Sequence, residues 1–264
     1  MIQTVAVCGA SGKMGREVVK AISRAEGLEL VGGVAPHHTG ADCGELAGVG
    51  HLDRPIVASL EDLPEKPDVM VDFTHPSAVK ANVVRALQAG VRAVVGTTGL
   101  FPEDLSEIAR MAEERGVGAI VAPNFALGAV LLMRFAAEAS RYFEHAEILE
   151  LHHNQKADAP SGTAIKTAEM MLTVRNAFGT GNVADREMLP GARGANFDDT
   201  GLRIHAIRLP GLVAHQEVIF GGLGQTLTLR HDSLSRESFM PGVLLAIRKV
   251  LELKGLVYGL EKLL

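Results

Sequence analysis

The amino-terminal segment of this 264-residue chain constrains its fold more than any other part. A short apolar run, Thr4 to Cys8, leads into the loop Gly9-Ala-Ser-Gly12-Lys-Met-Gly15, and apolar residues then recur at helical spacing through Ile22. A strand, a glycine-rich turn and a helix in this order are typical of a dinucleotide-binding unit, because glycines allow backbone amides to approach a pyrophosphate closely. The alternative is a plain strand-to-helix turn, since the spacing differs from the commoner Gly-x-Gly-x-x-Gly.

Further strands are predicted at 28–34, 68–73, 91–95 and 118–122, with helices at about 78–89 and 102–115. This alternation predicts a doubly wound parallel sheet, whose ligands lie beyond the carboxyl ends of its strands. We therefore expect the nicotinamide half of a cofactor near the residues that follow these strands, although each segment alone could be an ordinary turn. These residues are Phe73, Thr74, Gly96, Thr97, Thr98, Ala122, Pro123, Asn124 and Phe125.

The pattern changes after Phe125. A predicted helix at 128–141, a strand at 147–151 and a helix to about Phe178 precede three strand-like runs that look antiparallel, at 202–208, 215–220 and 225–231. We expect an α/β Rossmann-like doubly wound parallel sheet plus a second α+β domain with a mixed sheet. A last helix at 236–253 could pack back onto the first domain. The predicted domains are 1–123, completed by 233–264, for dinucleotide binding, and 124–232 for substrate binding and oligomerisation.

The stretch from Glu150 to Ala164 carries the groups with the most evident chemistry. A strand end leads into a loop with His152, His153 and Lys156, and a helix is predicted to begin at Pro160 to Thr163. The amides of a helix N-terminus attract a carboxylate, an ammonium adds positive charge, and imidazole transfers protons near neutral pH. These groups fit a site for a small anion that is being reduced, and the alternative is a polar loop before a capped helix.

Composition narrows the class of protein further. The net charge of −5 argues against binding to nucleic acid, and no apolar run approaches the roughly 20 residues needed to cross a membrane. The first segment lacks the features of a signal peptide, so we expect a cytoplasmic protein. Cys8 and Cys43 form no paired motif, so we expect both thiols to be reduced. No carboxylate follows the second predicted strand, at Val34-Ala-Pro-His-His38, so we expect NADPH and NADH both to be accepted.

Taken in order, the glycine loop, Phe73-Thr-His-Pro-Ser77, Gly96 to Gly99, Ala122 to Phe125 and the block from Glu150 to Ala164 resemble the dihydrodipicolinate reductase (4-hydroxy-tetrahydrodipicolinate reductase) family. The resemblance covers nearly the whole chain, and His152-His-x-x-Lys156-x-Asp-Ala-Pro-Ser-Gly-Thr-Ala164 is its specific part. It implies NADPH- or NADH-dependent reduction of a cyclic dicarboxylate in the diaminopimelate route to lysine. It also implies a homotetramer built through the sheet of the second domain.

The resemblance further implies roles for individual residues. His152 would donate or accept a proton, Lys156 would be a second donor, and His153, Gly162 and Thr163 would hold substrate carboxylates. The cofactor would contact Gly9, Ala10, Ser11, Gly12, Lys13, Met14, Gly96, Thr97, Thr98, Ala122, Pro123, Asn124 and Phe125. The chain departs from other members in lacking an acidic residue after the second strand, and in the sequence Leu209-Pro-Gly-Leu-Val-Ala-His215.

Other interpretations use other residues. A semialdehyde dehydrogenase would need Cys8 or Cys43 as its nucleophile. A short-chain dehydrogenase would use Tyr258 and Lys262, which we interpret as a coincidence in a tail helix.

Two further alternatives concern the same polar block. A metal ion could bind His152, His153 and Asp158. Because neighbouring strand residues point to opposite faces, the two histidines could not easily bind one ion, and we expect no metal site. A non-catalytic NAD(P)H sensor would need the glycine loop but neither His152 nor Lys156.

Overall fold

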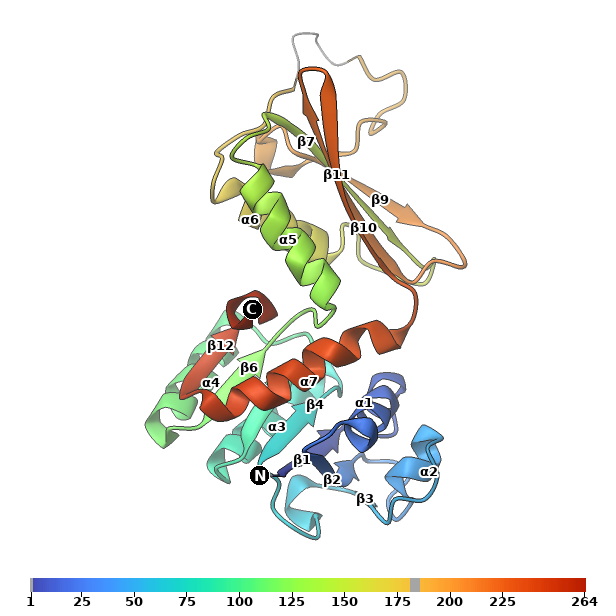
Figure 1. The fold of residues 1–264 in the computed structure, drawn as a ribbon, viewed down its shortest axis with the longest axis vertical. Helices are drawn as coiled ribbons and strands as arrows, with labels where there is room; N and C mark the ends of the chain where they lie inside the picture. Colours follow the sequence, from blue (N-terminus) through green and yellow to red (C-terminus); the bar gives the residue numbers. More distant parts are fainter. Residues whose placement is uncertain (1, 181–185) are drawn as a thin grey trace. The chain divides into compact units, whose positions relative to one another are not determined.

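The computed structural model describes residues 2–180 and 186–264, which divide into two compact units (Figure 1). Unit 1 comprises Met1–Phe125 and Phe239–Leu264, and unit 2 comprises Ala126–Ser238. The first crossing between the units thus falls after Phe125 rather than Pro123. The chain returns to unit 1 at Phe239 rather than at residue 233.

Unit 1 is built on a parallel sheet with strand order β12-β6-β5-β4-β1-β2-β3. Its strands are β1 (Gln3–Cys8), β2 (Leu28–Val34), β3 (Ile56–Val57), β4 (Val69–Asp72), β5 (Arg92–Val95), β6 (Gly118–Val121) and β12 (Gly255–Tyr258). The central position of β1 puts the glycine loop where the strand order reverses, which is the usual ligand position in such sheets. The predicted doubly wound sheet is confirmed.

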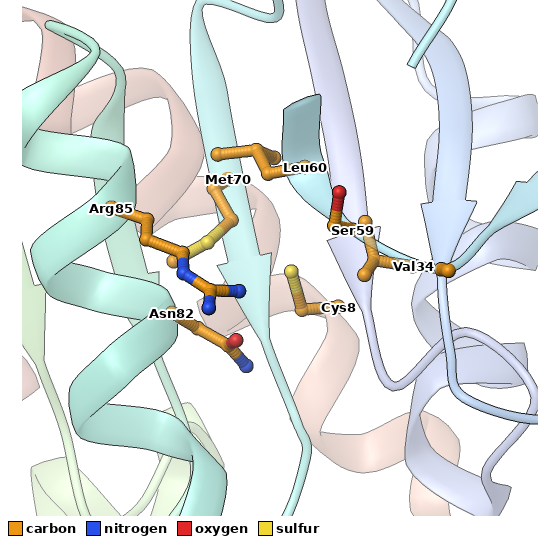
Figure 2. A pocket seen from close by; sticks show the side chains of 8 residues that line it. Cys8, Val34, Ser59, Leu60, Met70, Asn82 and Arg85 are labelled. Atoms are coloured by element: carbon orange, nitrogen blue, oxygen red, sulfur yellow. The ribbon is translucent and has the colours of Figure 1, made fainter. Parts of the chain in front are cut away.

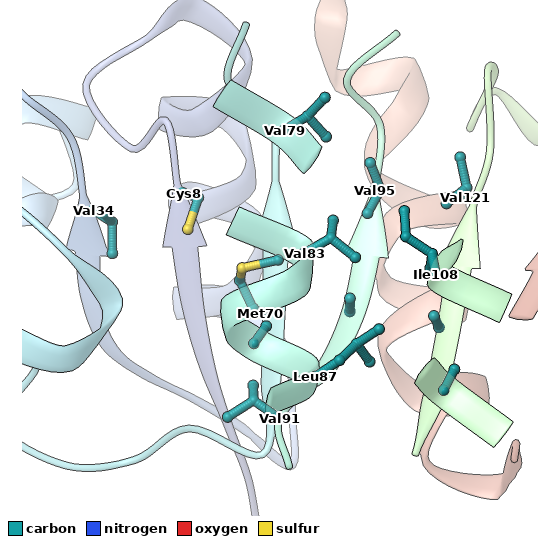
Figure 3. Close-up of a cluster of buried hydrophobic side chains, with 14 residues drawn as sticks. Cys8, Val34, Met70, Val79, Val83, Leu87, Val91, Val95, Ile108 and Val121 are labelled. Carbon is teal, nitrogen blue, oxygen red and sulfur yellow. The ribbon is translucent and has the colours of Figure 1, made fainter. Parts of the chain in front are cut away.

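Helices cover both faces of this sheet. They are α1 (Lys13–Arg24), which packs on α7 (Met240–Lys249), α3 (Pro76–Gln88), which packs on α4 (Pro102–Arg115), and the short α2 (Cys43–Ala47). Under α3 and α4, strand residues such as Met70 and Val95 meet Val83, Leu87 and Ile108 in a fully buried cluster (Figure 3). The nearly continuous apolar runs of these strands supply residues to this core on one face of the sheet.

Unit 2 has a mixed sheet with strand order β11-β10-β7-β9-β8, as the second predicted domain requires. Its elements are α5 (Leu127–Ala139), β7 (His145–His152), α6 (Gly162–Leu172), β8 (Ala195–Asn196), β9 (Arg203–Arg208), β10 (Ala214–Gly222) and β11 (Gln225–Ser233). One face of the sheet packs through Ile148, Val218 and Phe220 against buried residues of the two helices, such as Ala136 and Met171. This face anchors β7, the strand that ends at His152.

Several predicted elements were wrong in detail. β9 pairs in parallel with β7, so the runs after residue 202 are not all antiparallel. Helix α6 ends at Leu172 rather than near Phe178, which lies in the core of unit 2. The last helix is interrupted, with 3-10 turns at Arg236–Phe239 and Val250–Glu252 on either side of α7.

The chain end was also mispredicted. Tyr258 ends strand β12 and Lys262 lies in a 3-10 turn (Leu260–Leu263), so the pair does not share a tail helix. The short α2 and β3 were missed altogether. Within residues 2–180 and 186–264, no helix has the length and apolar character needed to cross a bilayer.

Candidate active site

The predicted cofactor residues of unit 1 meet at one edge of its sheet. Gly9 follows β1, Thr74 lies two residues beyond β4, Gly96 follows β5 and Ala122 follows β6. These strands are parallel neighbours, so their carboxyl ends share an edge. Ala10, Ala122 and Phe125 are each at most 2% exposed, so these three residues pack inside the unit and support the edge.

The glycine loop brings backbone segments unusually close together. Gly9 has a φ of +83°, and a Cβ atom on it would lie 2.3 Å from the carbonyl oxygen of Phe73. A Cβ atom on Gly15 would lie 2.0 Å from the carbonyl oxygen of Gly9. Glycine is therefore required at both positions, where β1, β4 and α1 converge.

Helix α1 begins with an open anion site. Its N-cap is Gly12, no side chain hydrogen-bonds to the N-terminal amides there, and its first turn has no acidic residue. Unpaired amides at the positive end of a helix dipole bind phosphate groups. This cradle fits the pyrophosphate of a nicotinamide dinucleotide.

Asp72, the last residue of β4, fixes the loops that follow β4 and β5. Its carboxylate is fully buried and accepts hydrogen bonds from the Thr74 amide (3.1 Å) and hydroxyl (2.7 Å). It also accepts from Thr97 Oγ1 (2.6 Å) and, on its second oxygen, from Asn82 Nδ2 (2.8 Å). One carboxylate thus sets the positions of two candidate cofactor loops.

Replacing Asp72→Asn should weaken both unit 1 and its nucleotide site. Both oxygens of Asp72 accept hydrogen bonds, so the NH2 group of the asparagine would face another donor, from Asn82 or from the two threonines. Each buried group left without a partner costs about 1–3 kcal/mol of folding free energy. We expect a lower urea midpoint and weaker NADPH affinity, measured by unfolding curves and fluorescence titration. The exposed control Asp53→Asn should change neither. Unchanged NADPH affinity in Asp72→Asn would contradict the loop-fixing role.

The residues after β2 bear on nucleotide selectivity. The chain continues through Ala35, Pro36, His37 and His38, and both histidines are exposed. No carboxylate stands at these positions to repel a 2′-phosphate.

In unit 2, His152 ends β7 and the polar loop leads to α6. The N-cap of α6 is Ser161, whose hydroxyl accepts a hydrogen bond from the Ala164 amide at 3.2 Å. The helix begins at Gly162, inside the predicted start at Pro160 to Thr163. Gly162 and Thr163 form the first turn, where we predicted them to hold carboxylates.

The two catalytic candidates are held differently. The side chain of His152 is 15% exposed, and its Nδ1 lies 2.6 Å from Glu150 Oε2. The ammonium of Lys156 lies 2.7 and 2.8 Å from the two carboxylate oxygens of Asp158, and this contact lowers the pKa of Asp158. His153 is exposed. These three predicted residues lie at the end of β7 and in the loop that follows it, and each of His152 and Lys156 contacts a carboxylate.

Sequence reasoning missed Glu150, whose buried carboxylate is the centre of this region. Arg208, on β9, donates Nη1 to Oε2 (2.8 Å) and Nη2 to Oε1 (2.7 Å). Burial acts to raise the pKa of Glu150, but hydrogen bonds from His152 and Arg208 outweigh it and lower the pKa overall. The available signal was a carboxylate at a position that alternates with Ala146 and Ile148, on the buried face of the strand.

Both cysteines are poor nucleophiles. Cys8 is 1% exposed and lies among Val34, Met70 and Asn82 beside a small pocket (Figure 2). Burial and the nearby Asp72 carboxylate raise its pKa well above the usual range. Burial also raises the pKa of Cys43 to about 12. A thiolate mechanism is therefore disfavoured.

The residues considered for a metal site already contact other side chains. His152 is engaged by Glu150, and Asp158 by Lys156. Across the residues that the structure describes, no group of three or more His, Cys, Asp or Glu side chains is arranged to hold a metal ion.

A Rossmann-type unit with an open phosphate cradle, joined to a second α+β unit with its own cationic loop, defines a two-domain oxidoreductase that uses a nicotinamide dinucleotide. Family models narrow this class. Residues 3–125 match the one described as dihydrodipicolinate reductase, N-terminus, and residues 128–264 match its C-terminus. The chain belongs to the dihydrodipicolinate reductase family, as its sequence motifs predicted.

Individual relatives agree with this assignment. A 4-hydroxy-tetrahydrodipicolinate reductase from Nostoc sp. is 54% identical, over 98% of this chain and 97% of the relative. One from Thermosynechococcus vestitus is 55% identical, over 99% and 96%. A solved dipicolinate-bound dihydrodipicolinate reductase from Paenisporosarcina sp. TG-14 has 48% identity and a TM-score of 0.88, covering 100% of both chains.

Proposed function

We propose that this chain reduces 4-hydroxy-tetrahydrodipicolinate to tetrahydrodipicolinate with NADPH or NADH, in the diaminopimelate route to lysine. The observation that carries this proposal is the sequence of groups at the end of β7: the His152 imidazole, the Lys156 ammonium and the N-terminus of α6. Relatives that are more than half identical to this chain are named for the same reaction. Replacing a hydroxyl by hydrogen consumes one hydride and one proton and releases one water.

In this proposal, unit 2 supplies the substrate site. Lys156 binds a substrate carboxylate that displaces Asp158, and the amides of Gly162 and Thr163 with the His153 side chain hold the second carboxylate. His152 and Lys156 supply or relay the proton from positions beside the ring. These groups neutralise the two substrate carboxylates. They therefore allow a dianionic substrate to bind although the chain as a whole carries a net negative charge.

Unit 1 supplies the nucleotide site. The bound nicotinamide dinucleotide supplies the hydride. Gly9 to Met14 hold its pyrophosphate, and Gly96 to Thr98 and Ala122 to Phe125 border its nicotinamide half. Because no carboxylate follows β2, both NADPH and NADH are accepted.

The test is an absorbance assay of NADPH and NADH consumption with freshly generated product of the preceding synthase. We expect steady oxidation of both nucleotides that depends on the cyclic dicarboxylate. The alternative of a non-catalytic sensor predicts nucleotide binding without turnover. That result would overturn the proposed reaction.

We further propose a cytoplasmic homotetramer built through the open face of the unit 2 sheet. The half-exposed side chains of Leu149, Ile207 and Ile219 line a groove on this face, opposite the helices. Covering such an apolar face is a common reason for subunit association. Light scattering should give the mass of four chains, and a monomer would contradict this assembly.

A further inference from the structure

Glu150 joins the separate parts of the candidate substrate site in unit 2. Its carboxylate accepts hydrogen bonds from His152 at the end of β7 and from Arg208 at the end of β9. It also accepts one from the backbone amide of Ser161, the N-cap of α6, at 3.1 Å. The imidazole and the helix N-terminus are therefore fixed to one buried group.

Arg208 extends this connection to the loop of Lys156. Its Nη2 donates to the backbone carbonyl of Asp158 at 2.7 Å as well as to Glu150. Asp158 in turn contacts the Lys156 ammonium through its side chain. The ion pair of Glu150 and Arg208 thus spans from the strand ends to the loop between β7 and α6.

The network also determines the proton position on His152. An ionised carboxylate only accepts hydrogen bonds, so the contact at 2.6 Å requires the proton to be on Nδ1. In neutral imidazole the other nitrogen, Nε2, then carries no proton and is available to a ligand. A carboxylate that orients a histidine in this way controls both its tautomer and its direction.

We propose that Glu150, held by Arg208, is a positioning residue that sets the tautomer and orientation of His152 and fixes the N-terminus of α6 beside it. This inference rests on the proposed function for its effect on turnover. Its effect on the imidazole can be measured without turnover. Glu150 itself does not touch the substrate.

The first experiment is ¹⁵N NMR of histidine side chains in the full chain, with His152 assigned by comparison with His152→Gln. At neutral or slightly alkaline pH we expect His152 to be protonated on Nδ1 and not on Nε2. A neutral ring protonated on Nε2, or a rapid mixture of both tautomers, would overturn the inference. This readout needs neither substrate nor a Glu150 variant that folds.

The second experiment compares Glu150→Gln, Glu150→Asp and Glu169→Gln in the NADPH assay. The glutamine of Glu150→Gln has one carbonyl oxygen and one NH2 group, so it would place a donor against either His152 or Arg208. The orientation of His152 would then be lost, and kcat should fall on the order of 100-fold. The affinity for NADPH, which binds in unit 1, should not change. Glu150→Asp keeps the charge and should recover part of the loss. Glu169, on the exposed side of α6 and 3.4 Å from Lys166, is the control that should retain full activity.

The outcomes separate the two proposals. Failure of the wild-type chain to consume NADPH would refute the reaction, while the NMR result would still decide the role of Glu150. Normal turnover by the wild type together with an unchanged kcat in Glu150→Gln would refute the positioning role. A loss of NADPH affinity that parallels the loss of turnover would indicate general unfolding of the variant, and the NMR result on the wild-type chain would then decide the role of Glu150.

Discussion

Replacing Lys156 with alanine should lower kcat/KM for the cyclic dicarboxylate on the order of 100-fold and leave the affinity for NADPH unchanged. The substitution removes the ammonium that we propose to bind a substrate carboxylate and assist proton transfer. In the structure this ammonium is already bound to a carboxylate, that of Asp158. A substrate carboxylate can therefore replace one partner of an existing contact.

The measurement pairs steady-state kinetics with fluorescence titration of NADPH. Lys166→Ala is the matched control, because Lys166 lies on α6 of the same unit and its ammonium lies 3.4 Å from the carboxylate of the exposed Glu169. We expect the control to behave like the wild type. Weakened NADPH binding in Lys156→Ala would contradict the division of labour between the two units.

Replacing Gly12 with aspartate should strongly weaken nucleotide binding without unfolding unit 1. Gly12 is the N-cap of α1 and has a φ of −77°, which every residue can adopt. Aspartate is a preferred N-cap, so the helix should remain stable. Its carboxylate would occupy the amides offered to the pyrophosphate and repel it, and NADPH affinity should fall roughly 100-fold, about 2.7 kcal/mol.

Calorimetry and thermal unfolding measure the two effects separately. A Cβ atom on Gly12 would lie 3.2 Å from the Gly9 carbonyl oxygen, so a small shift of the loop is required. Gly12→Ala introduces the same Cβ without the charge and is the matched control. Full NADPH affinity in Gly12→Asp would show that the N-terminus of α1 does not hold the pyrophosphate.

Elements with strong local signals were predicted well from the sequence. Helix α4 was predicted at 102–115 and observed at Pro102–Arg115. Proline at its first position and Gly116 in the left-handed conformation after it, at a φ of 63°, define both ends locally. The fold of unit 1 could be predicted from such local signals, because its strands and helices alternate regularly.

Elements that depend on distant partners were missed. Strand β12 has four residues and forms by pairing with β6, which lies more than a hundred residues earlier in the chain. β9 was assigned the wrong direction because its partner, β7, is not its neighbour in sequence. Local patterns do not record which strands will pair.

The candidate site also has one part that local sequence signals predicted and one part that depends on distant residues. His152, Lys156 and the start of α6 are close in sequence, so their motif was visible. The partner that holds Glu150, Arg208, is 58 residues away and becomes its neighbour when β9 pairs with β7. The positioning network could therefore not be read from the block that carries the candidate catalytic residues.

We propose that the imidazole of His152 and the ammonium of Lys156 act on a substrate ring that lies against the reduced nicotinamide in the ternary complex. A crystal structure of the chain with NADPH and dipicolinate tests it directly. We predict the dipicolinate carboxylates on Lys156 and the first turn of α6, His152 Nε2 within hydrogen-bond reach of the ligand, and the nicotinamide C4 about 3–3.5 Å from its ring. Dipicolinate bound away from these residues, or His152 turned away from it in this complex, would contradict the proposed substrate site.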